Sequence, residues 1–148
     1  MGSRKIQVLL VEDNPTDVLI AEEGLLSANL LDTTLHVADD GVDAIEFLCR
    51  RGKYANAPRP DLILLDLNMP RMNGQEVLAR VKADDELKNI PVVILTTSKS
   101  TEDVAEAYGH HANCYISKPV DYDEFTGAMK MIQSFWFSVV TLPSNTGE

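Results

Sequence analysis

The sequence predicts an α/β fold in which helices cover both faces of a doubly wound parallel sheet. Five short apolar runs alternate with amphipathic segments along the chain. The apolar runs are nearly continuous rather than alternating with polar residues, which is typical of strands buried on both faces. In a parallel sheet the carboxyl ends of the strands share one edge, and folds of this class bind their ligands there.

The five expected strands are rich in valine, isoleucine and leucine, which suit a buried pleated surface. The second run is the weakest, because it contains polar residues. The predicted strands span Ile6–Val11, Thr34–Ala38, Leu62–Leu65, Val92–Leu95 and Cys114–Ile116.

The expected helices begin beside residues that can cap free backbone N–H groups. Asn14 precedes Pro15, and Asp121 lies three residues before Glu124, the spacing of a capping box. Apolar residues then recur at helical spacing. The predicted helices span Pro15–Ala28, Gly41–Arg51, Asn73–Ala83, Thr101–His110 and Asp121–Val140.

The length and charge of the chain restrict the number of domains and the kinds of partner that we expect. We expect residues 1–148 to form a single domain, with a core over 6–137 and a C-terminal extension over 138–148. The net charge of −10 would repel a polyanion, so nucleic acid is not an expected partner. The sequence has neither a long apolar span nor a secretory signal, which predicts a cytoplasmic protein that does not bind membranes.

Side chains that can bind a metal or a phosphate follow four of the five expected strands. Glu12 and Asp13 follow the first strand, and Asp66 follows the third. Thr96 follows the fourth strand and Lys118 the fifth. A parallel sheet would therefore bring three carboxylates, a hydroxyl and an ammonium into one crevice.

The three carboxylates would repel one another unless a cation lay among them. At a separation of about 4 Å and an effective dielectric of about 20, each pair costs about 4 kcal/mol. Oxygen ligands favour Mg²⁺, Mn²⁺ or Ca²⁺, and Mg²⁺ also takes a phosphate oxygen, so Mg²⁺ (or Mn²⁺) is the expected cofactor. A carboxylate such as Asp66 can attack phosphorus, while Lys118 and Thr96 hold other oxygens of the same group.

Each motif also has an ordinary interpretation, since an acidic pair or Asp66 alone can simply form a turn. A phosphatase of the haloacid dehalogenase type needs a second Asp two residues after its nucleophile, where this chain has Asn68. A flavin or nucleotide module needs a glycine-rich loop after the first strand, where this chain has acids. An adaptor that works without phosphorylation is the remaining alternative, and an acetyl phosphate assay distinguishes it.

The order and spacing of these residues resemble the receiver domains of response regulators. The resemblance runs from Ile6 to about Phe137 and includes the proline after Lys118. It implies a flavodoxin-like five-stranded sheet with strand order 2-1-3-4-5 and five helices. It also implies a phosphoacceptor of two-component signalling with at most slow self-dephosphorylation, rather than an enzyme.

The resemblance further implies a role for each acidic residue. The phosphoacceptor falls on Asp66. The metal ligands fall on the carboxylates of Glu12, Asp13 and Asp66 and on the backbone carbonyl of Asn68. Glu12 stands where the family more often has aspartate, but it remains an oxygen ligand.

The same resemblance implies a switch. Thr96 and Lys118 bind the phosphoryl group, and Thr96 moves toward it. Tyr115 then swings into the vacated space, which rearranges the face formed by the fourth helix, the fifth strand and the fifth helix.

Two longer segments resemble the small response regulators of bacterial phytochrome histidine kinases. These segments are RRGKYANAPRPDLILLDLNMP, which ends at Pro70, and QSFWFSVVTLP, which ends at Pro143. The resemblance implies a phytochrome kinase as partner and a homodimeric assembly.

The C-terminal aromatic residues support a dimer independently. Phe135, Trp136 and Phe137 are consecutive and fan about 200° around a helix, so one core face cannot bury all three. Val140 extends the apolar run. We expect these four residues to form a homodimer interface, with a fold-back of the chain end as the alternative.

Overall fold

The structure is a computed structural model, and it describes residues 5–26 and 32–136. The described strands are β1 (Lys5–Val11), β2 (Asp32–Ala38), β3 (Leu62–Leu65), β4 (Val92–Thr96) and β5 (Cys114–Ser117). They form a parallel sheet in the order β2-β1-β3-β4-β5. The predicted doubly wound sheet and its strand order are confirmed.

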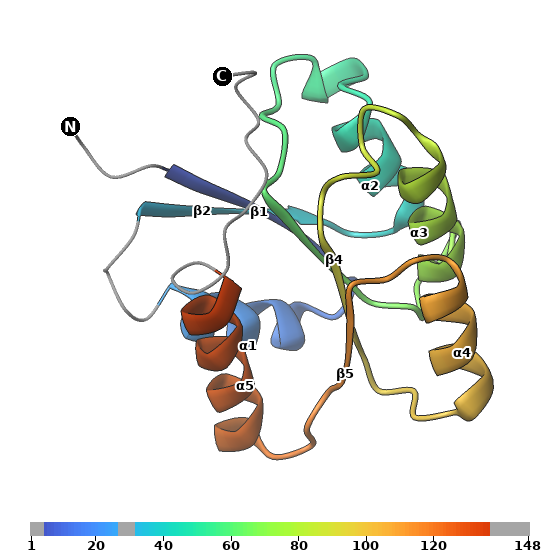
Figure 1. Cartoon of the computed structure of the whole chain (residues 1–148). Helices are drawn as coiled ribbons and strands as arrows, with labels where there is room; N and C mark the ends of the chain where they lie inside the picture. Colours follow the sequence, from blue (N-terminus) through green and yellow to red (C-terminus); the bar gives the residue numbers. More distant parts are fainter. Residues whose placement is uncertain (1–4, 27–31, 137–148) are drawn as a thin grey trace.

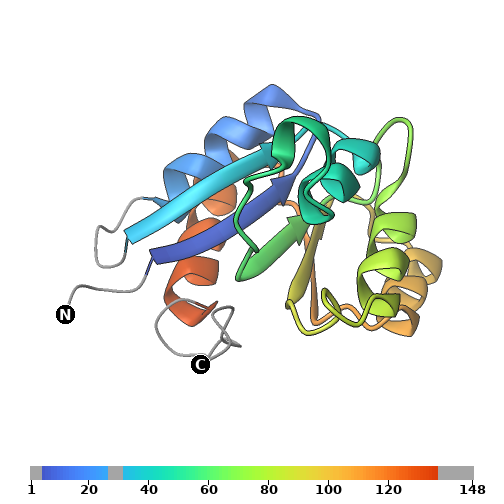
Figure 2. The same cartoon turned by 90° about the horizontal axis from the view of Figure 1, so that it is seen from above.

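The helices lie on both faces of the sheet (Figures 1 and 2). Helices α1 and α5 cover one face, and α2, α3 and α4 cover the other. A short 3₁₀ helix, η1 (Gly52–Tyr54), follows α2 and was not predicted. The bounds are α1 (Pro15–Leu25), α2 (Gly41–Leu48), α3 (Gly74–Ala83), α4 (Thr101–Gly109) and α5 (Tyr122–Ser134).

The strands are apolar throughout because both of their faces are buried. Successive residues of β3 point to opposite faces: Ile63 and Leu65 pack with α2 and α3, whereas Leu62 and Leu64 pack with α1 and α5. All four are fully buried. This two-sided burial explains why the sequence shows continuous apolar runs and not a period of two.

The predicted N-terminal caps are confirmed. The Asn14 side chain accepts hydrogen bonds from the backbone of Thr16 and Asp17, at 2.9 and 3.2 Å. The Asp121 carboxylate accepts one from Glu124 N at 3.0 Å. These bonds satisfy N–H groups that a helix leaves free in its first turn.

The C-terminal ends were predicted less well. Helix α2 ends at Leu48 rather than Arg51, because Arg50 adopts a left-handed φ of 57° and Arg51 N returns to Glu46 O at 2.9 Å. Helix α1 ends at Leu25, and α5 ends at Ser134 with Phe135 as its cap. Residues 27–28 and 137–140 of the two predicted helices, including Phe137 and Val140, lie outside the described residues.

Helices α1 and α5 approach each other closely. A Cβ atom on Gly24 would lie 2.3 Å from the Met129 Cβ, so only glycine permits this packing. Tyr122 at the start of α5 also donates a hydrogen bond to the Glu23 carboxylate. Among the described helices, none is long and apolar enough to cross a membrane.

Candidate functional site

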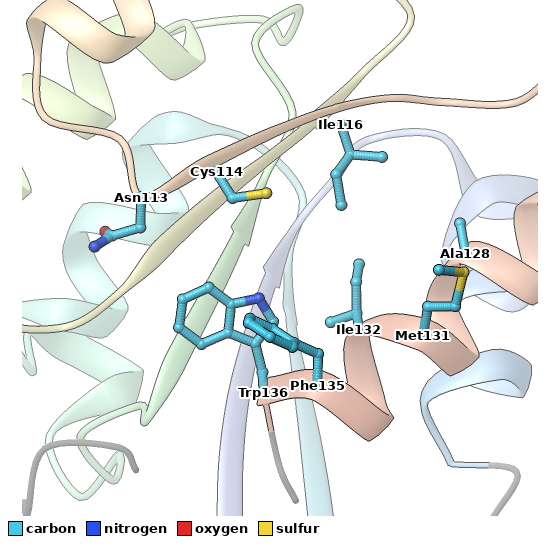
Figure 3. A pocket seen from close by; sticks show the side chains of 8 residues that line it. All are labelled: Asn113, Cys114, Ile116, Ala128, Met131, Ile132, Phe135 and Trp136. Atoms are coloured by element: carbon cyan, nitrogen blue, oxygen red, sulfur yellow. The ribbon is translucent and has the colours of Figure 1, made fainter. Parts of the chain in front are cut away.

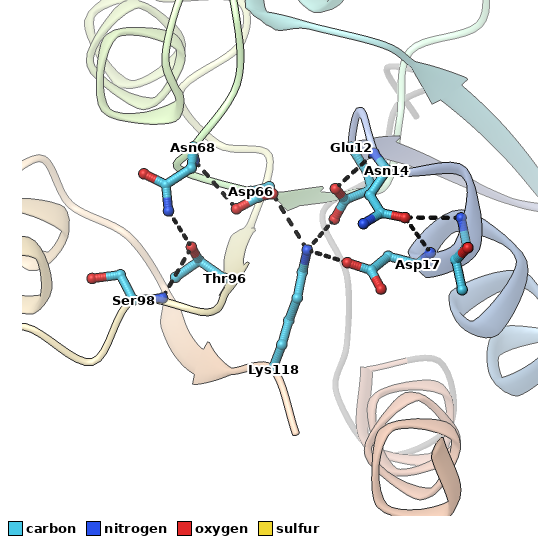
Figure 4. A network of polar contacts seen from close by, with 9 residues as sticks. Glu12, Asn14, Asp17, Asp66, Asn68, Thr96, Ser98 and Lys118 are labelled. Atoms are coloured by element: carbon cyan, nitrogen blue, oxygen red, sulfur yellow. Dashed lines mark hydrogen bonds and ion pairs between the residues drawn. The ribbon is translucent and has the colours of Figure 1, made fainter. Parts of the chain in front are cut away.

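Backbone hydrogen bonds between neighbouring strands place the predicted site residues at one edge of the sheet. Glu12 N donates to Ala38 O, and Asp66 N donates to Val11 O, both at 3.0 Å. Lys118 N donates to Thr96 O at 2.7 Å. Because these backbone bonds continue the pairing past the strands, the side chains of Glu12, Asp66, Thr96 and Lys118 meet in one crevice (Figure 4).

The carboxylates form the acidic side of this crevice. One oxygen each of Glu12, Asp13 and Asp66 can be chosen so that all three lie within 4.8 Å of one another. Glu12 is 2% exposed and Asp66 is 6% exposed, whereas Asp13 lies at the surface. Three carboxylate oxygens gathered in this way suit a hard divalent cation.

Lys118 provides the cationic side. Its Nζ donates to Glu12 Oε1 at 2.5 Å, to Asp17 Oδ2 at 2.8 Å and to Asp66 Oδ2 at 3.3 Å. Burial alone would lower the pKa of Lys118, but the hydrogen bonds to Asp17 and Glu12 and the charge of Asp66 raise it above its ordinary value. The ammonium therefore stays protonated at neutral pH.

The pKa of Glu12 is raised mainly because its carboxyl group is buried. Burial raises it from 4.5 to about 7, against the hydrogen bond from Lys118, and the charge of Asp66 adds to the rise. The geometry gives one ammonium, that of Lys118, three carboxylate partners. A dication placed among them would favour their ionised forms.

A hydroxyl and an amide line the opposite side of Asp66. The buried Thr96 Oγ1 accepts a hydrogen bond from Asn68 Nδ2 at 3.5 Å and one from Ser98 N at 3.4 Å. Asn68 N also donates to Asp66 Oδ1 at 3.3 Å. Asn68 therefore contacts the Asp66 carboxylate directly, and Thr96 is linked to it through the Asn68 side chain.

Tyr115 lies on β5, beside Ile94 of β4, and is half-buried. Its hydroxyl donates to Ser98 O at 2.9 Å, and Ser98 Oγ bonds the Asp103 carboxylate of α4 at 2.5 Å. A continuous set of contacts thus links Thr96, through the segment after β4, to α4 and β5.

The segment after Asp66 is held against the sheet by close packing. A Cβ atom on Gly74 would lie 2.2 Å from Asp66 O, so glycine is required where α3 begins. Gly74 N also donates to Leu67 O at 2.9 Å. These contacts fix the backbone that carries Asp66 and Asn68.

Sequence reasoning missed one member of the site, Asp17. Its carboxylate contacts Lys118, although the sequence assigned it no role at the site. The signal was present: a helix that starts at Pro15 begins at the edge of the sheet where β1 ends. Sequence alone did not show that Asp17 would face inward.

The chain matches the response regulator receiver domain over residues 8–130. It belongs to that family. Response regulator Rcp1 of Synechocystis sp. is 44% identical over 137 residues, which cover 93% of this chain and 92% of Rcp1. The chain is therefore a receiver domain with a phosphoacceptor role in two-component signalling.

Solved receiver structures are similar over nearly the whole chain. The phosphorylated cyanobacterial phytochrome response regulator RcpA is 43% identical with a TM-score of 0.92, covering 95% of this chain and all of that one. The Mn²⁺-bound form of Rcp1 is 44% identical with a TM-score of 0.90, covering 94% and 99%. The bacteriophytochrome response regulator AtBRR is 36% identical with a TM-score of 0.71, covering 95% and 99%.

Proposed function

We propose that Asp66 is the phosphoacceptor of this receiver and takes a phosphoryl group from a phosphohistidine of a sensor histidine kinase. The observation that carries the proposal is the position of Asp66. Its buried carboxylate lies between two other acids and the ammonium of Lys118, at the carboxyl edge of a parallel sheet. This is the edge where folds of this class bind ligands.

The ligand set fits Mg²⁺ or Mn²⁺. Glu12, Asp13 and Asp66 would hold the ion through carboxylate oxygens, and Asn68 would hold it through its backbone carbonyl. The geometry supports this assignment, because one oxygen from each of the three carboxylates lies within 4.8 Å of the others. When bound, such an ion neutralises charge on the phosphoryl oxygens.

The residues of the chain carry out the transfer itself. A carboxylate oxygen of Asp66 attacks phosphorus, and the new O–P bond forms as the P–N bond to the kinase histidine breaks. The imidazole leaves with the electron pair of that bond. Lys118 and Thr96 lie on either side of Asp66, where they can hold phosphoryl oxygens as the transfer proceeds.

Acetyl phosphate tests the assignment without a kinase. With Mg²⁺, the wild-type chain should gain one phosphoryl group by intact mass and shift in Phos-tag electrophoresis. Asp66→Asn should gain none, because its amide is not a nucleophile. Phosphorylation of Asp66→Asn at the wild-type rate would overturn the assignment, and a wild type that takes up no phosphoryl group would favour the adaptor.

We propose that Thr96 and Tyr115 form the switch. The hydroxyl of Thr96 would exchange its contacts with Asn68 and Ser98 for a phosphoryl oxygen. Tyr115 would then leave Ser98 O and turn inward, which alters the face of α4, β5 and α5. Thr96→Ala should keep phosphorylation of Asp66 but lose the change in Tyr115 signals by NMR.

A bacterial phytochrome is the proposed kinase. The support is the similarity to RcpA and AtBRR, which are phytochrome response regulators, over 95% of this chain in each case. Phosphoryl transfer from a purified phytochrome kinase, compared with an unrelated sensor kinase, tests the pairing. Equal rates from both kinases would contradict it.

The proposed homodimer would use an apolar groove between β5 and α5 (Figure 3). The groove has a volume of about 490 Å³ and lies beside Phe135 and Trp136, whose rings meet edge-on at 5.7 Å. Trp136 packs partly against the core, but Phe135 is 52% exposed and Met131 is 72% exposed. A second copy would cover these apolar side chains.

Light scattering tests the dimer. Wild type should have twice the monomer mass, and Phe135→Asp should reduce it to the monomer. Leu19→Asp is the matched control, because Leu19 is also an exposed apolar residue, at 65% against 52% for Phe135, but lies on α1. A monomeric wild type, with or without acetyl phosphate, would reject this interface and leave the fold-back of the chain end.

A further inference from the structure

The ammonium of Lys118 has three carboxylate partners, and one of them has no assigned part in binding metal or phosphate. That partner is Asp17, whose Oδ2 lies 2.8 Å from Lys118 Nζ. A lysine ammonium has three hydrogens to donate. Glu12, Asp17 and Asp66 use one each, and the longest of the three bonds, at 3.3 Å, is the one to Asp66.

The first turn of α1 holds Asp17 in place. Asn14 caps the helix and accepts a hydrogen bond from Asp17 N at 3.2 Å. A carboxylate at this end of a helix is favoured by the helix dipole. The Asp17 side chain is 22% exposed, against 4% for Lys118, so Asp17 is the more solvent-accessible partner of the pair.

The three partners come from two separate parts of the sheet edge. Glu12 follows β1 and Asp17 opens α1, so both belong to one short segment. Asp66 follows β3 instead. Figure 4 shows the ammonium between these two sides, tied twice to the β1–α1 segment and once to Asp66.

We propose that Asp17 is a positioning residue that holds Lys118 toward the β1–α1 segment and keeps it from pairing fully with Asp66. The proposal rests on the proposed function, in which Asp66 binds metal and accepts the phosphoryl group. A carboxylate paired with an ammonium is a weaker metal ligand and a weaker nucleophile. By sharing the ammonium, Asp17 leaves Asp66 open until a phosphoryl oxygen arrives for Lys118 to bind.

Removal of the Asp17 charge should shift Lys118 toward Asp66. The Mg²⁺ dissociation constant of Asp17→Asn should rise about fivefold, the size of one charge-assisted hydrogen bond exchanged between carboxylates. Phosphorylation by acetyl phosphate should slow by a similar factor at low Mg²⁺. It should recover at saturating Mg²⁺, because the ion and the ammonium compete for the same carboxylate.

A double-mutant cycle on the full chain separates this role from a general loss of negative charge. Isothermal titration with Mg²⁺ would compare wild type, Asp17→Asn, Lys118→Ala and the double variant. In the Lys118→Ala background, Asp17→Asn should change the dissociation constant less than twofold. Asp39→Asn is the matched control, since Asp39 lines the same hollow as Asp13 and, in the described part of the chain, does not contact Lys118.

A side-chain ¹⁵N NMR spectrum reports directly on the surroundings of the Lys118 ammonium. If Asp17 had a purely structural role, this signal would not change in its variants. The Lys118 ammonium signal, assigned by its loss in Lys118→Ala, should shift in Asp17→Asn and return toward wild type in Asp17→Glu. An equal effect of Asp17→Asn with and without Lys118, or an equal effect of Asp39→Asn, overturns the proposal. A wild type that binds Mg²⁺ but takes up no phosphoryl group would instead overturn the function of Asp66 and leave this cycle as a valid test.

Discussion

The acidic crevice at the strand ends and the apolar groove between β5 and α5 are unusual in opposite ways. Most protein surfaces expose charged side chains and bury apolar ones. The crevice buries charge, with Glu12 at 2% and Asp66 at 6% exposure. The groove exposes apolar side chains, with Met131 at 72% and Phe135 at 52%. Buried charges and exposed apolar patches both leave free energy to be gained by binding, but from different ligands.

The two regions differ in how their interactions respond to the solution. Coulombic repulsion in the crevice depends on pH, on divalent ions and on each nearby charge. The apolar groove depends on buried area and shape, which pH and Mg²⁺ do not alter. Variants in the two regions should therefore respond differently to the same change of solution.

The largest effect should come from removing Lys118, whose ammonium contacts the buried carboxylates of Glu12 and Asp66. Lys118→Ala leaves Glu12 and Asp66 buried without it, which should lower the free energy of unfolding by about 4 kcal/mol at pH 8 without metal. Urea unfolding measures the loss, and Mg²⁺ should restore part of it. Lys88→Ala, which breaks an exposed pair with Asp85, should cost less than about 0.5 kcal/mol. Equal losses in the two variants would contradict the comparison.

The second-largest effect on the free energy of unfolding should come from a change of pH, through Glu12 in the crevice. The folded chain holds Glu12 at a pKa of about 7, above its ordinary 4.5, so it binds more protons than the unfolded chain within that window. Without metal, the free energy of unfolding should therefore fall as pH rises from 4.5 to 7, by up to about 3 kcal/mol from this group. Glu12→Gln should flatten this slope, and an unchanged slope in that variant would reject the assignment.

Substitutions in the groove should hardly change the free energy of unfolding in the same experiments. Met131→Ala should change the free energy of unfolding of the monomer by less than about 1 kcal/mol, independent of pH and Mg²⁺, because this side chain is exposed. Met129→Ala, on the buried side of α5, should cost about 3 kcal/mol. Guanidinium unfolding at low protein concentration compares the two, and similar losses would show that Met131 is part of the core.

The smallest effect should come from an ion pair at the rim of the sheet edge. Arg71 donates two hydrogen bonds to Asp40, at 2.7 and 3.1 Å, and these bonds hold the pKa of Asp40 below its ordinary 3.8. The pair stabilises the fold above that pH and loses its effect as pH falls through the depressed pKa. Arg71→Ala should therefore lower the melting temperature slightly at pH 7, and the loss should shrink as the pH falls below 3.8. A loss that does not change with pH would point to packing by the Arg71 stem instead.

The sequence predicted the residues that meet at the sheet edge because their positions follow from chain direction. Once Asp66 and Lys118 each follow a parallel strand, the ladder brings them to the same edge. The inward turn of Asp17 was not predicted, because an acidic residue in a first helical turn is usually explained by capping and the helix dipole. The left-handed Arg50 that ends α2 was missed for a similar reason, since non-glycine residues seldom adopt that conformation.

The sequence by itself determined the strand and helix alternation, the parallel sheet and the set of acids at its carboxyl edge, since periodicity and local capping depend on neighbours along the chain. The tertiary structure decided which carboxylates share Lys118, how far the pKa of Glu12 rises and which side of α5 stays exposed. Those properties depend on distance and burial among residues up to 106 positions apart, and no local pattern in the chain specifies them.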